Sequence, residues 1–529
     1  MYKDFLRKNW QIITFNLILL MVFILGYGRF GDVMVDCFRE GYIPECILKG
    51  QVLYKDIFTI YAPFAYLFNA LLFLIFGINL KVLYFAGFIT TAGILNLLFK
   101  ISNRFMTKTY SLGVIIFVIS ASVLSPNVFN MIFPYSYGML YGILFTLGSV
   151  YFALNKQFPL AFCMYSFAVC SKYEFVMLLP ALIWAFIKNR NYDVRFFVKT
   201  IFAFILPVII NFVPLYFMGM STENLILSVR LLGEIGHSKT LHWFYSVSGL
   251  IFRRELLVVY FINFIKVFAP LWFISKYRNK LVYFAAFLYF YFVVTPEILV
   301  YSLPFILVLF IIMYRGLKFE KQFFVVSSLL VSLKVFFAVT MLSYGVFFLP
   351  FVLVSLFIVC PPRYKKSMLS VFIMLALCTG IHNVSALSLK NVKINTQKGY
   401  ICVSEYYSPL KDVIEYVSEN TNKDDMVIVY PESLAVNFLA GRVSDSKFYS
   451  LIPLYVEVFG NDIIQTRLHM IKPEYIILTN YDTSVYGLSQ FGEDYAKGVK
   501  SYVAQRYQFF KTYGNRMFFN LYKLKHTDK

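Results

Sequence analysis

The first candidates for catalytic residues lie in the segment Phe30–Lys81. This segment carries two acidic residues four positions apart, Asp36 and Glu40, which would share one face of a helix. A carboxylate that is held against a hydroxyl group can take its proton, as a general base does. Asp36 is the first candidate for that role, and a loop carboxylate paired with Arg39 is the alternative. Glu40 is the second candidate or a structural residue.

Basic side chains that could hold a phosphate group lie in several parts of the chain. Lys172 and Glu174 form a turn between two short apolar segments, and charged residues in such a place are usually paired or functional. A structural pair of Lys172 with Glu174 or with Asp36 is the alternative. For Arg253 and Arg254, which precede a predicted span, the alternative is an ordinary contact with lipid headgroups. The predicted phosphate contacts are Lys172, Arg253, Arg254 and Lys55.

Aromatic and charged residues that could line a substrate pocket complete the set. An aromatic belt at a membrane interface is the alternative for the tyrosines of the segment Phe133–Tyr137. Glu234, His237 and His242 could meet a metal ion, but they lack the tight spacing of a metal motif. The sequence therefore predicts no cofactor, with a divalent metal as a minor alternative. The predicted pocket residues are Glu174, Tyr61, Tyr135, Tyr137, His237 and Lys334.

The composition predicts that membrane-spanning helices carry these residues. Hydrophobic residues make up 59% of the 529 residues and aromatic residues 20%, which is more apolar surface than a soluble chain of this length can keep from water. Apolar runs of about 15 to 21 residues, the length that spans require, follow one another from Asn9 to Ala386. We expect thirteen spans, at residues 10–29, 81–99, 111–126, 138–153, 158–171, 174–187, 200–219, 256–275, 281–294, 299–314, 322–341, 344–360 and 367–386.

The distribution of charge orients these spans. The net charge is +21, and the segments on the side of the N-terminus hold 20 Lys and Arg against 3 Asp and Glu, whereas the outer loops, counted with the span-edge residues Arg29, Lys81 and Glu174, hold 10 of each. Positive charge collects on the cytoplasmic side of membrane proteins. We therefore place the N-terminus in the cytoplasm, the C-terminus outside and the chain in the plasma (inner) membrane. The basic excess then requires no nucleic acid partner.

The apolar stretch Tyr61–Phe76 is predicted not to cross the membrane. If it crossed, the cluster of Lys100, Arg104 and Lys108 would lie outside, and every later basic loop would follow it. That arrangement would break the positive-inside rule many times. A single interfacial or re-entrant helix explains the same sequence with no such violation.

The hydropathy falls to values typical of a globular domain after about Asn391. Helical spacing predicts helices over residues 410–417 and 461–470, and strands are predicted over residues 426–430 and 475–478. We expect a transmembrane domain at residues 1–390, with a catalytic first outer loop at 30–81, and an extracytoplasmic α/β domain at residues 391–529. The sequence has no GxGxxG, P-loop, HExxH or CxxC motif. Cys37 and Cys46 share the first outer loop and could pair in an oxidising compartment, although spacing alone does not decide this.

The first outer loop contains an ordered set of motifs. Asp36 comes soon after the first span, and it is followed by the stretch Gly50–Phe58, by the Pro-aromatic segment Tyr61–Tyr66 and by the pair Phe76-Gly77. Together with the spans, the Lys-containing turn Ser171–Glu174 and the α/β tail, this set resembles the GT-C superfamily of membrane glycosyltransferases. The resemblance is greatest to the bacterial dolichyl-phosphate-mannose-type and lipid A aminoarabinose transferase-like branch.

This resemblance implies a polytopic helical fold of the GT-C type, with Asp36 as the catalytic carboxylate. It implies transfer of a sugar from a polyprenyl-phosphate donor to a cell-envelope glycan, lipid or protein acceptor on the outer face, with membrane lipids as the surrounding partner. A polyprenyl phosphate is a good leaving group, so such an enzyme needs a base and cations more than an acid. The sequence departs from the aminoarabinose branch at Tyr61-Ala62, where that branch has a lysine before a Pro-Pro pair. The phosphate-binding lysine must come from elsewhere, or the lipid is held differently.

Two other classes of function fit parts of the sequence. A polytopic transporter or flippase of lipid-linked sugars tends to place ionisable groups near the bilayer midplane and often shows repeats. Here the charges gather at the outer ends of the spans, and we see no repeat. A non-catalytic assembly factor would use the tail as a partner-binding domain, and the outer carboxylate and Lys172 weigh against it.

The charge count makes a prediction about topology. We expect residues 100–110 to face the cytoplasm and the tail from Asn391 to lie outside, because only this arrangement keeps the basic loops on one side. Cysteines introduced at Ser111 and Ser484 should react with an impermeant thiol reagent from opposite sides of the membrane. Labelling of both positions from the same side would contradict the topology.

Overall fold

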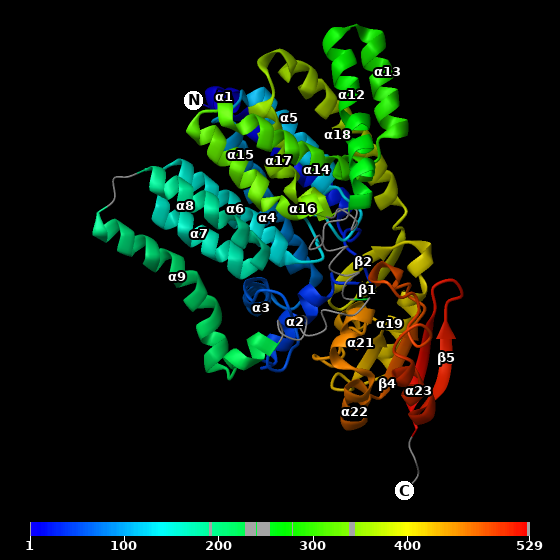
Figure 1. The fold of residues 1–529 in the computed structure, drawn as a ribbon. Coiled ribbons are helices and arrows are strands. Elements are labelled where there is room, and N and C mark those ends of the chain that lie inside the picture. The colour runs from blue at the N-terminus through cyan, green and yellow to red at the C-terminus, as the bar shows by residue number, and fades with distance from the viewer. Residues whose placement is uncertain are drawn as a thin grey trace. The chain divides into compact units, whose positions relative to one another are not determined.

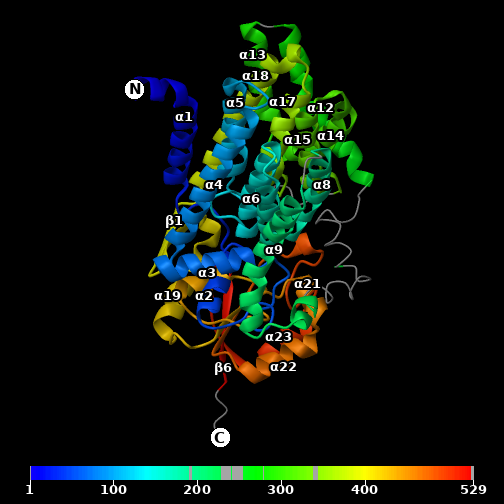
Figure 2. The same cartoon turned by 90° about the vertical axis from the view of Figure 1, so that its left-hand side faces the viewer.

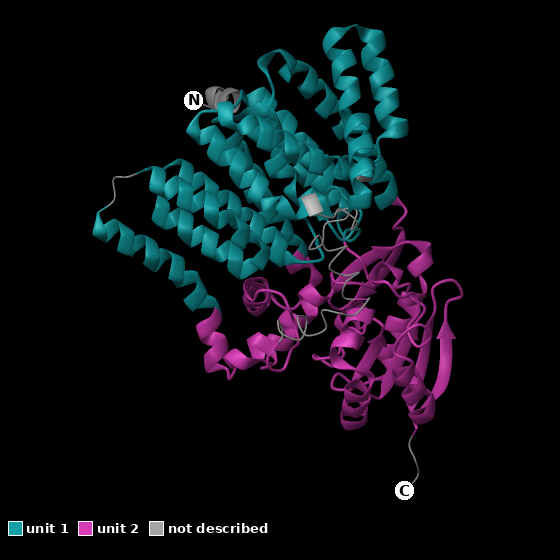
Figure 3. Ribbon diagram, in the orientation of Figure 1, with its two compact units in different colours: residues 1–30, 84–211, 246–387 teal, residues 31–83, 212–245, 388–529 magenta. Residues whose placement is uncertain are grey.

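The chain folds into two compact units. The computed structural model describes residues 2–189, 193–227, 240, 254–277, 279–337 and 344–525. One unit contains residues 1–30, 84–211 and 246–387, and the other contains residues 31–83, 212–245 and 388–529 (Figure 3). Most of the predicted first outer loop therefore belongs to the same compact unit as the predicted α/β tail.

The first unit is built of helices (Figure 1). Helices suit an apolar chain because each satisfies its own backbone N–H and C=O groups where no water can do so. Its helices are α1 (Tyr2–Gly26), α4 (Leu80–Ser102, which begins in the second unit), α5 (Lys108–Val118), α6 (Tyr137–Leu154), α7 (Phe158–Ser171), α8 (Leu179–Lys188), α9 (Val194–Phe217, which ends in the second unit), α12 (Leu257–Lys276), α13 (Lys280–Val293), α14 (Pro296–Met313), α15 (Phe319–Val331), α16 (Leu333–Phe337), α17 (Leu349–Val359) and α18 (Lys365–Ser388).

Each of the thirteen predicted spans overlaps one helix or two consecutive helical segments, and residues 338–341 of the span 322–341 lie outside the described residues. In the described part of the chain, seven helices are long and apolar enough to cross a membrane, and all seven lie where spans are predicted. Their bounds are Asn9–Gly26, Leu80–Ser102, Tyr137–Leu154, Val194–Phe217, Arg254–Lys276, Ile298–Gly316 and Pro362–Ser388. The chain is thus a polytopic helical membrane protein.

The other six predicted spans correspond to shorter or interrupted helices, and the sequence explains where several of them break. Lys172 follows α7 in an extended conformation, and the 3₁₀ turn Tyr173–Leu178 leads into α8. Pro180 and Pro350 lie in the first turn of α8 and of α17, where a missing N–H costs nothing. A turn at Ser332 separates α15 from α16.

Helices α5, α15 and α17 lie side by side in both views (Figures 1 and 2). Every residue of α17 is buried, as expected for a helix that is apolar on all sides and surrounded by protein. Ser111 of α5 is buried as well. Thr109 is exposed in the same segment, so it is the better position for the labelling experiment on topology.

The second unit combines the early segment with an α/β fold. Its early helices are α2 (Arg39–Leu48) and α3 (Phe64–Phe76), which lie beside each other (Figure 2). Helix α3 has 13 residues and is therefore about 20 Å long, which is shorter than a hydrocarbon core of about 30 Å. Helices α7 and α13, which overlap predicted spans, have only 14 residues each. The positive-inside rule, and not the length of α3, therefore supports the prediction that the stretch Tyr61–Phe76 does not cross. The later elements are β1 (Val392–Thr396), β2 (Gly399–Val403), α19 (Pro409–Asn420), β3 (Val427–Tyr430), α20 (Leu434–Ala440), α21 (Pro453–Phe459), α22 (Asn461–Ile471), β4 (Tyr475–Thr479), α23 (Lys497–Arg506), β5 (Tyr507–Tyr513) and β6 (Phe519–Leu524).

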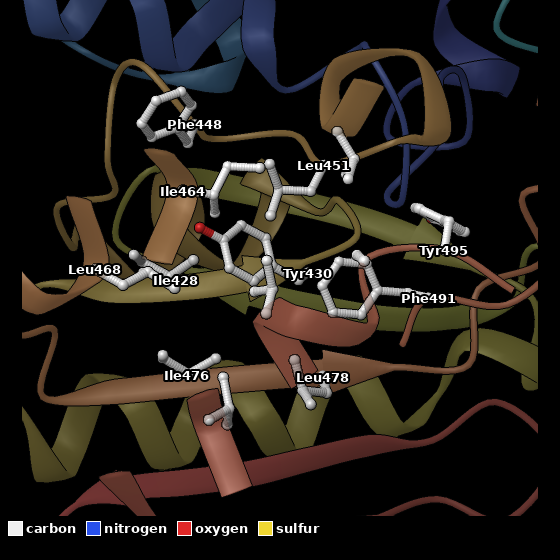
Figure 4. Packing of buried hydrophobic residues seen from close by; sticks show 14 of the residues in the cluster. Ile428, Tyr430, Phe448, Leu451, Ile464, Leu468, Ile476, Leu478, Phe491 and Tyr495 are labelled. Atoms are coloured by element: carbon white, nitrogen blue, oxygen red, sulfur yellow. The ribbon is translucent and has the colours of Figure 1, made fainter. Parts of the chain in front are cut away.

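A four-stranded sheet forms the centre of this unit, in the order β3-β4-β6-β5. Strands β3 and β4 are parallel and are joined through α20, α21 and α22, whereas β6 runs antiparallel to both of its neighbours. Side chains of β3 and β4 pack against α22 and α23 in a buried apolar cluster (Figure 4). Its members include Ile428, Tyr430, Ile464, Leu468, Ile476, Leu478 and Val499. The two predicted helices and two predicted strands are confirmed as α19, α22, β3 and β4.

Candidate active site

A tightly turned segment between α1 and α2 positions Asp36. The Asp32 carboxylate accepts hydrogen bonds from the backbone N–H groups of Met34 (2.7 Å) and Val35 (3.1 Å), a turn that aspartate favours. Asp36 itself has a φ of 57°, and this left-handed conformation costs a residue with a Cβ atom about 1 to 2 kcal/mol. The surrounding contacts must therefore hold Asp36 in place.

The main contact of Asp36 is an ion pair with Arg39, the first residue of α2. The Arg39 guanidinium lies 2.5 Å from the Asp36 carboxylate and 3.6 Å from that of Glu40, with only 4% of its side chain exposed. The guanidinium also lies over the ring of Tyr61, whose centroid is 4.4 Å away, at cation–π distance. The two predicted catalytic carboxylates and the predicted pocket residue Tyr61 thus meet at one guanidinium.

Tyrosines surround this guanidinium. Burial raises the pKa of Tyr61 to about 12, and it raises the pKa of Tyr66 and Tyr449 well above the ordinary value. All three phenols therefore stay neutral at physiological pH. The negative charges that face Arg39 are then the carboxylates of Asp36 and Glu40, and the tyrosines around it are neutral.

A third carboxyl group, Glu432, reaches the same place from the carboxyl end of β3. Its Oε1 accepts a hydrogen bond from the Asp36 backbone N–H (3.3 Å), and its Oε2 accepts one from the Ser450 hydroxyl (3.1 Å). The neighbouring Ser433 hydroxyl donates to the Val33 carbonyl (2.8 Å). Burial, with a smaller contribution from the charge of Asp36, raises the pKa of Glu432 to about 8.

Glu432 was not predicted as a site residue, although its position in the sequence carries a signal. Ligand sites in α/β folds lie beyond the carboxyl ends of parallel strands. The predicted strand at residues 426–430 is followed directly by Pro431, Glu432 and Ser433. An acidic residue at that position is a candidate on these grounds alone.

A half-buried pair, Asp32 and Lys390, lies at the same turn and was also missed by sequence analysis. The Lys390 ammonium donates to the Gly31 carbonyl at 2.7 Å. Burial raises the pKa of Asp32 and lowers that of Lys390, and the attraction between the two groups opposes both changes. The hydrogen bond from Lys390 to Gly31 joins the beginning of the α/β tail to the start of the first loop.

Exposure distinguishes the three carboxyl groups at Arg39. The side chain of Asp36 is 24% exposed, whereas those of Glu40 and Glu432 are nearly inaccessible, Glu40 at 1% and Glu432 at 5%. A carboxylate must be reachable to take a proton from a substrate. Asp36 meets that condition, and Glu40 is placed as a structural residue would be.

A second cluster lies in the first unit. It contains four residues that the sequence predicted, Glu174, Lys172, Lys334 and Tyr135, together with Tyr344. The Glu174 carboxylate lies 3.3 Å from the Lys334 ammonium and 3.7 Å from that of Lys172, and it accepts a short hydrogen bond from the Tyr344 hydroxyl. Lys172 also contacts the Tyr135 hydroxyl. The Lys172 ammonium lies over the rings of Tyr135 and Tyr344, at 4.6 and 5.0 Å, and that of Lys334 lies 4.4 Å from the Tyr344 ring. Two ammonium groups thus share one carboxylate within an aromatic enclosure.

The remaining predicted site residues lie elsewhere. Tyr137 is fully buried, and its hydroxyl donates to the Ile132 carbonyl (3.3 Å), so it packs inside its unit. Lys55 and Arg254 are exposed, and neither belongs to either cluster. Arg253 and His237 lie outside the described residues.

Neither a disulfide nor a metal cluster is present in the part of the chain that the structure describes. Cys37 and Cys46, which could have paired, are not joined in a disulfide. The Cys37 Sγ accepts a hydrogen bond from the Asp32 backbone N–H at 3.3 Å. Among the described residues, no three His, Cys, Asp or Glu side chains are grouped to hold a metal ion. The metal candidates Glu234, His237 and His242 lie outside that part.

Comparisons with known proteins give structural matches. No family model matches the sequence, and no curated protein matches it significantly. A crystal structure of the Archaeoglobus fulgidus oligosaccharyltransferase, in complex with Zn and sulfate, matches 97% of this chain over 73% of its own, with 12% identity and a TM-score of 0.50. The oligosaccharyltransferase AglB from the same organism, with an inhibitory peptide and a dolichol-phosphate, matches 99% of this chain over 75% of its own (10% identity, TM-score 0.46). ArnT from Cupriavidus metallidurans, bound to undecaprenyl phosphate, matches 97% of this chain over 98% of its own (12% identity, TM-score 0.43).

Removing the Arg39 guanidinium is expected to destabilise the protein. Arg39→Met keeps much of the side-chain volume but leaves the carboxylates of Asp36 and Glu40 without their cation, so we expect the free energy of unfolding to fall by about 3 to 5 kcal/mol. Thermal unfolding of the purified protein in detergent measures the change. Lys500→Met is the matched control, because Lys500 pairs with Glu493 at the surface (3.3 Å), where such pairs contribute about 0 to 1 kcal/mol. An Arg39→Met variant as stable as the control would show that the guanidinium does not hold this site together.

Proposed function

Because the chain has the fold of the membrane glycosyltransferases that its motifs resemble, we propose that it transfers a sugar from a polyprenyl-phosphate donor to a hydroxyl-bearing acceptor of the cell envelope. The fold is shared with the archaeal oligosaccharyltransferase over nearly the whole chain. The observation that carries the proposal is the placement of Asp36, a partly exposed carboxylate anchored by a buried arginine.

In this reaction Asp36 acts as the general base. The acceptor hydroxyl loses its proton to the Asp36 carboxylate as its oxygen forms a bond to the anomeric carbon of the sugar. The bond from that carbon to the phosphate oxygen breaks, and its electron pair leaves with the polyprenyl phosphate. Arg39 holds one face of Asp36, so the carboxylate is already oriented before the acceptor binds.

Two lysines are proposed to bind the phosphate of the donor. The cluster of Lys172, Lys334 and Glu174 carries two positive charges against one negative charge, and its rings reduce contact with water. An anionic phosphate is the partner that such a net positive cluster favours. Tyr135 and Tyr344 can donate hydrogen bonds there as well. Arg253, Arg254 and Lys55 remain predicted donor contacts.

The proposed topology places this chemistry on the outer side of the plasma (inner) membrane. The N-terminus is then cytoplasmic and the α/β tail extracytoplasmic, as the basic loops require. AglB was solved with a dolichol-phosphate and ArnT with undecaprenyl phosphate. A membrane-bound polyprenyl phosphate and a glycan, lipid or protein acceptor are the partners we propose for this chain.

The Asp36→Asn variant tests the base. The amide keeps the size of the carboxylate but cannot take a proton, so we expect turnover at saturating donor to fall by about a hundredfold or more. Sugar transfer by the purified variant measures this, with thermal unfolding as a check on the fold. Glu40→Gln is the matched control, since Glu40 is inaccessible and its loss should lower stability more than turnover. A near-normal rate for Asp36→Asn would make Glu174 the better candidate.

The donor site is tested by removing its positive charges. Lys172→Gln and Lys334→Gln should each raise the KM for the lipid donor by about tenfold, because a hydrogen bond to a charged group contributes about 1.5 to 3 kcal/mol. Lys266→Gln is the control, because Lys266 also lies in a helix of the first unit but outside the cluster. Arg254→Gln belongs in the same assay. An unchanged donor KM in both cluster variants would refute the assignment.

A further inference from the structure

Glu432 is a buried carboxyl group with no assigned role, and its contacts are specific. One oxygen accepts the backbone N–H of Asp36 and the other contacts the hydroxyl of Ser450. A neutral carboxyl can keep both contacts, since its carbonyl oxygen and the oxygen that carries the proton each retain a lone pair that can accept a hydrogen bond. The geometry therefore does not require Glu432 to be charged.

The charges around Glu432 favour the neutral form. Three carboxyl groups, those of Asp36, Glu40 and Glu432, gather near the single guanidinium of Arg39. Arg39 already pairs with Asp36, so a charged Glu432 would add a further negative charge in a buried place. Such a charge is costly unless it is paired. The other titratable groups that face Glu432 from the neighbouring elements are Tyr61, Tyr449, Tyr455, Tyr481, Tyr486 and Tyr495.

We propose that Glu432 is a positioning residue of the active site, which holds a proton at working pH and fixes the peptide of Asp36 through its N–H group. The backbone of Asp36 is in a left-handed conformation, and a fixed hydrogen bond to its N–H keeps that conformation in place. The neutral Glu432 also leaves Asp36 as the exposed negative charge of the site. This role rests on the proposed function of Asp36 as the base.

Ionisation of Glu432 should weaken binding of the lipid donor. Ionisation of Glu432 would put a second negative charge beside Asp36, and an anionic lipid donor would be repelled by it. Since burial raises the pKa of Glu432 to about 8, kcat/KM for the donor should fall as the pH rises above about 8.

The first experiment measures the pH dependence of kcat/KM between pH 6 and 10 in wild type and in two variants. Glu432→Gln keeps an acceptor for the Asp36 N–H but cannot ionise, so the fall above pH 8 should disappear. Glu432→Leu loses that acceptor, so kcat should fall about tenfold further than in Glu432→Gln, as expected for one buried hydrogen bond of about 1.4 kcal/mol. An unchanged alkaline fall in Glu432→Gln, or equal kcat values in the two variants, would overturn the proposal.

A second variant covers the case in which Glu432→Gln does not fold. The Ser450 hydroxyl donates to Glu432 and favours its ionised form. Ser450→Ala should therefore move the alkaline fall to higher pH. A fall at the wild-type pH in Ser450→Ala would contradict the assignment of that titration to Glu432.

The second experiment needs no activity and so separates this inference from the proposed function. A carboxyl group whose pKa is higher in the folded than in the unfolded state stabilises the fold fully below the unfolded pKa, and this stability is lost as the pH rises through the folded pKa. For Glu432 the loss runs from its ordinary value of 4.5 to about 8. The melting temperature of Glu432→Gln should therefore fall less between pH 5 and pH 8 than that of wild type.

The matched control for this measurement is Glu493→Gln, which changes an exposed glutamate of the same unit. Its melting temperature should depend on pH as that of wild type does. Equal pH dependence in wild type, Glu432→Gln and Glu493→Gln would overturn the proposal even if sugar transfer is found. If wild type transfers no sugar from polyprenyl phosphates while the melting curves differ as expected, the proposed function fails and the proton on Glu432 stands.

Discussion

The second unit is organised around the burial of the Arg39 guanidinium. A buried cation is costly unless its charge and its hydrogen-bonding groups are matched. Here the segment before α2 provides Asp36, the first turn of α2 provides Glu40, and Tyr61 provides the face of its ring. Because these partners come from different parts of the early chain, their positions depend on one another. The left-handed backbone of Asp36 is one result, since the ion pair compensates for its conformational cost.

Sequence alone predicted those contacts of the candidate site that are local in the chain and missed those that are not. Asp36, Glu40 and Arg39 lie within four positions, so their meeting follows from chain geometry. Lys172 and Glu174 are equally close, but Lys334 is 160 residues from Glu174, and its approach depends on helix packing. Glu432 meets Asp36 across 396 residues. The hydrophobic periodicity of a sequence does not predict a contact between residues so far apart in the chain.

For the fold as well, the elements predicted from the sequence are those set by local sequence, and an element that depends on tertiary pairing was missed. The apolar runs predicted where helices lie, because hydropathy is a property of each segment. Strands β3 and β4 were predicted from their continuous apolar runs, as expected for buried parallel strands. Strand β5 was missed because its side chains are mostly exposed and its sequence, Tyr507–Tyr513, includes polar residues throughout. Its place is set by pairing with β6, which is a tertiary interaction.

The contacts of Ser433 with Val33 and of Glu432 with Asp36 also impose an order on biosynthesis. Each joins residues about 400 positions apart, and a ribosome that adds about 5 to 20 residues per second needs roughly 20 to 80 s to cover that distance. During this interval the segment with Asp36 has been made, but its partners from the tail have not. The segment with Asp36 therefore acquires these two hydrogen bonds only after Glu432 and Ser433 have been synthesised, so folding of the α/β tail is a late step that completes the candidate active site.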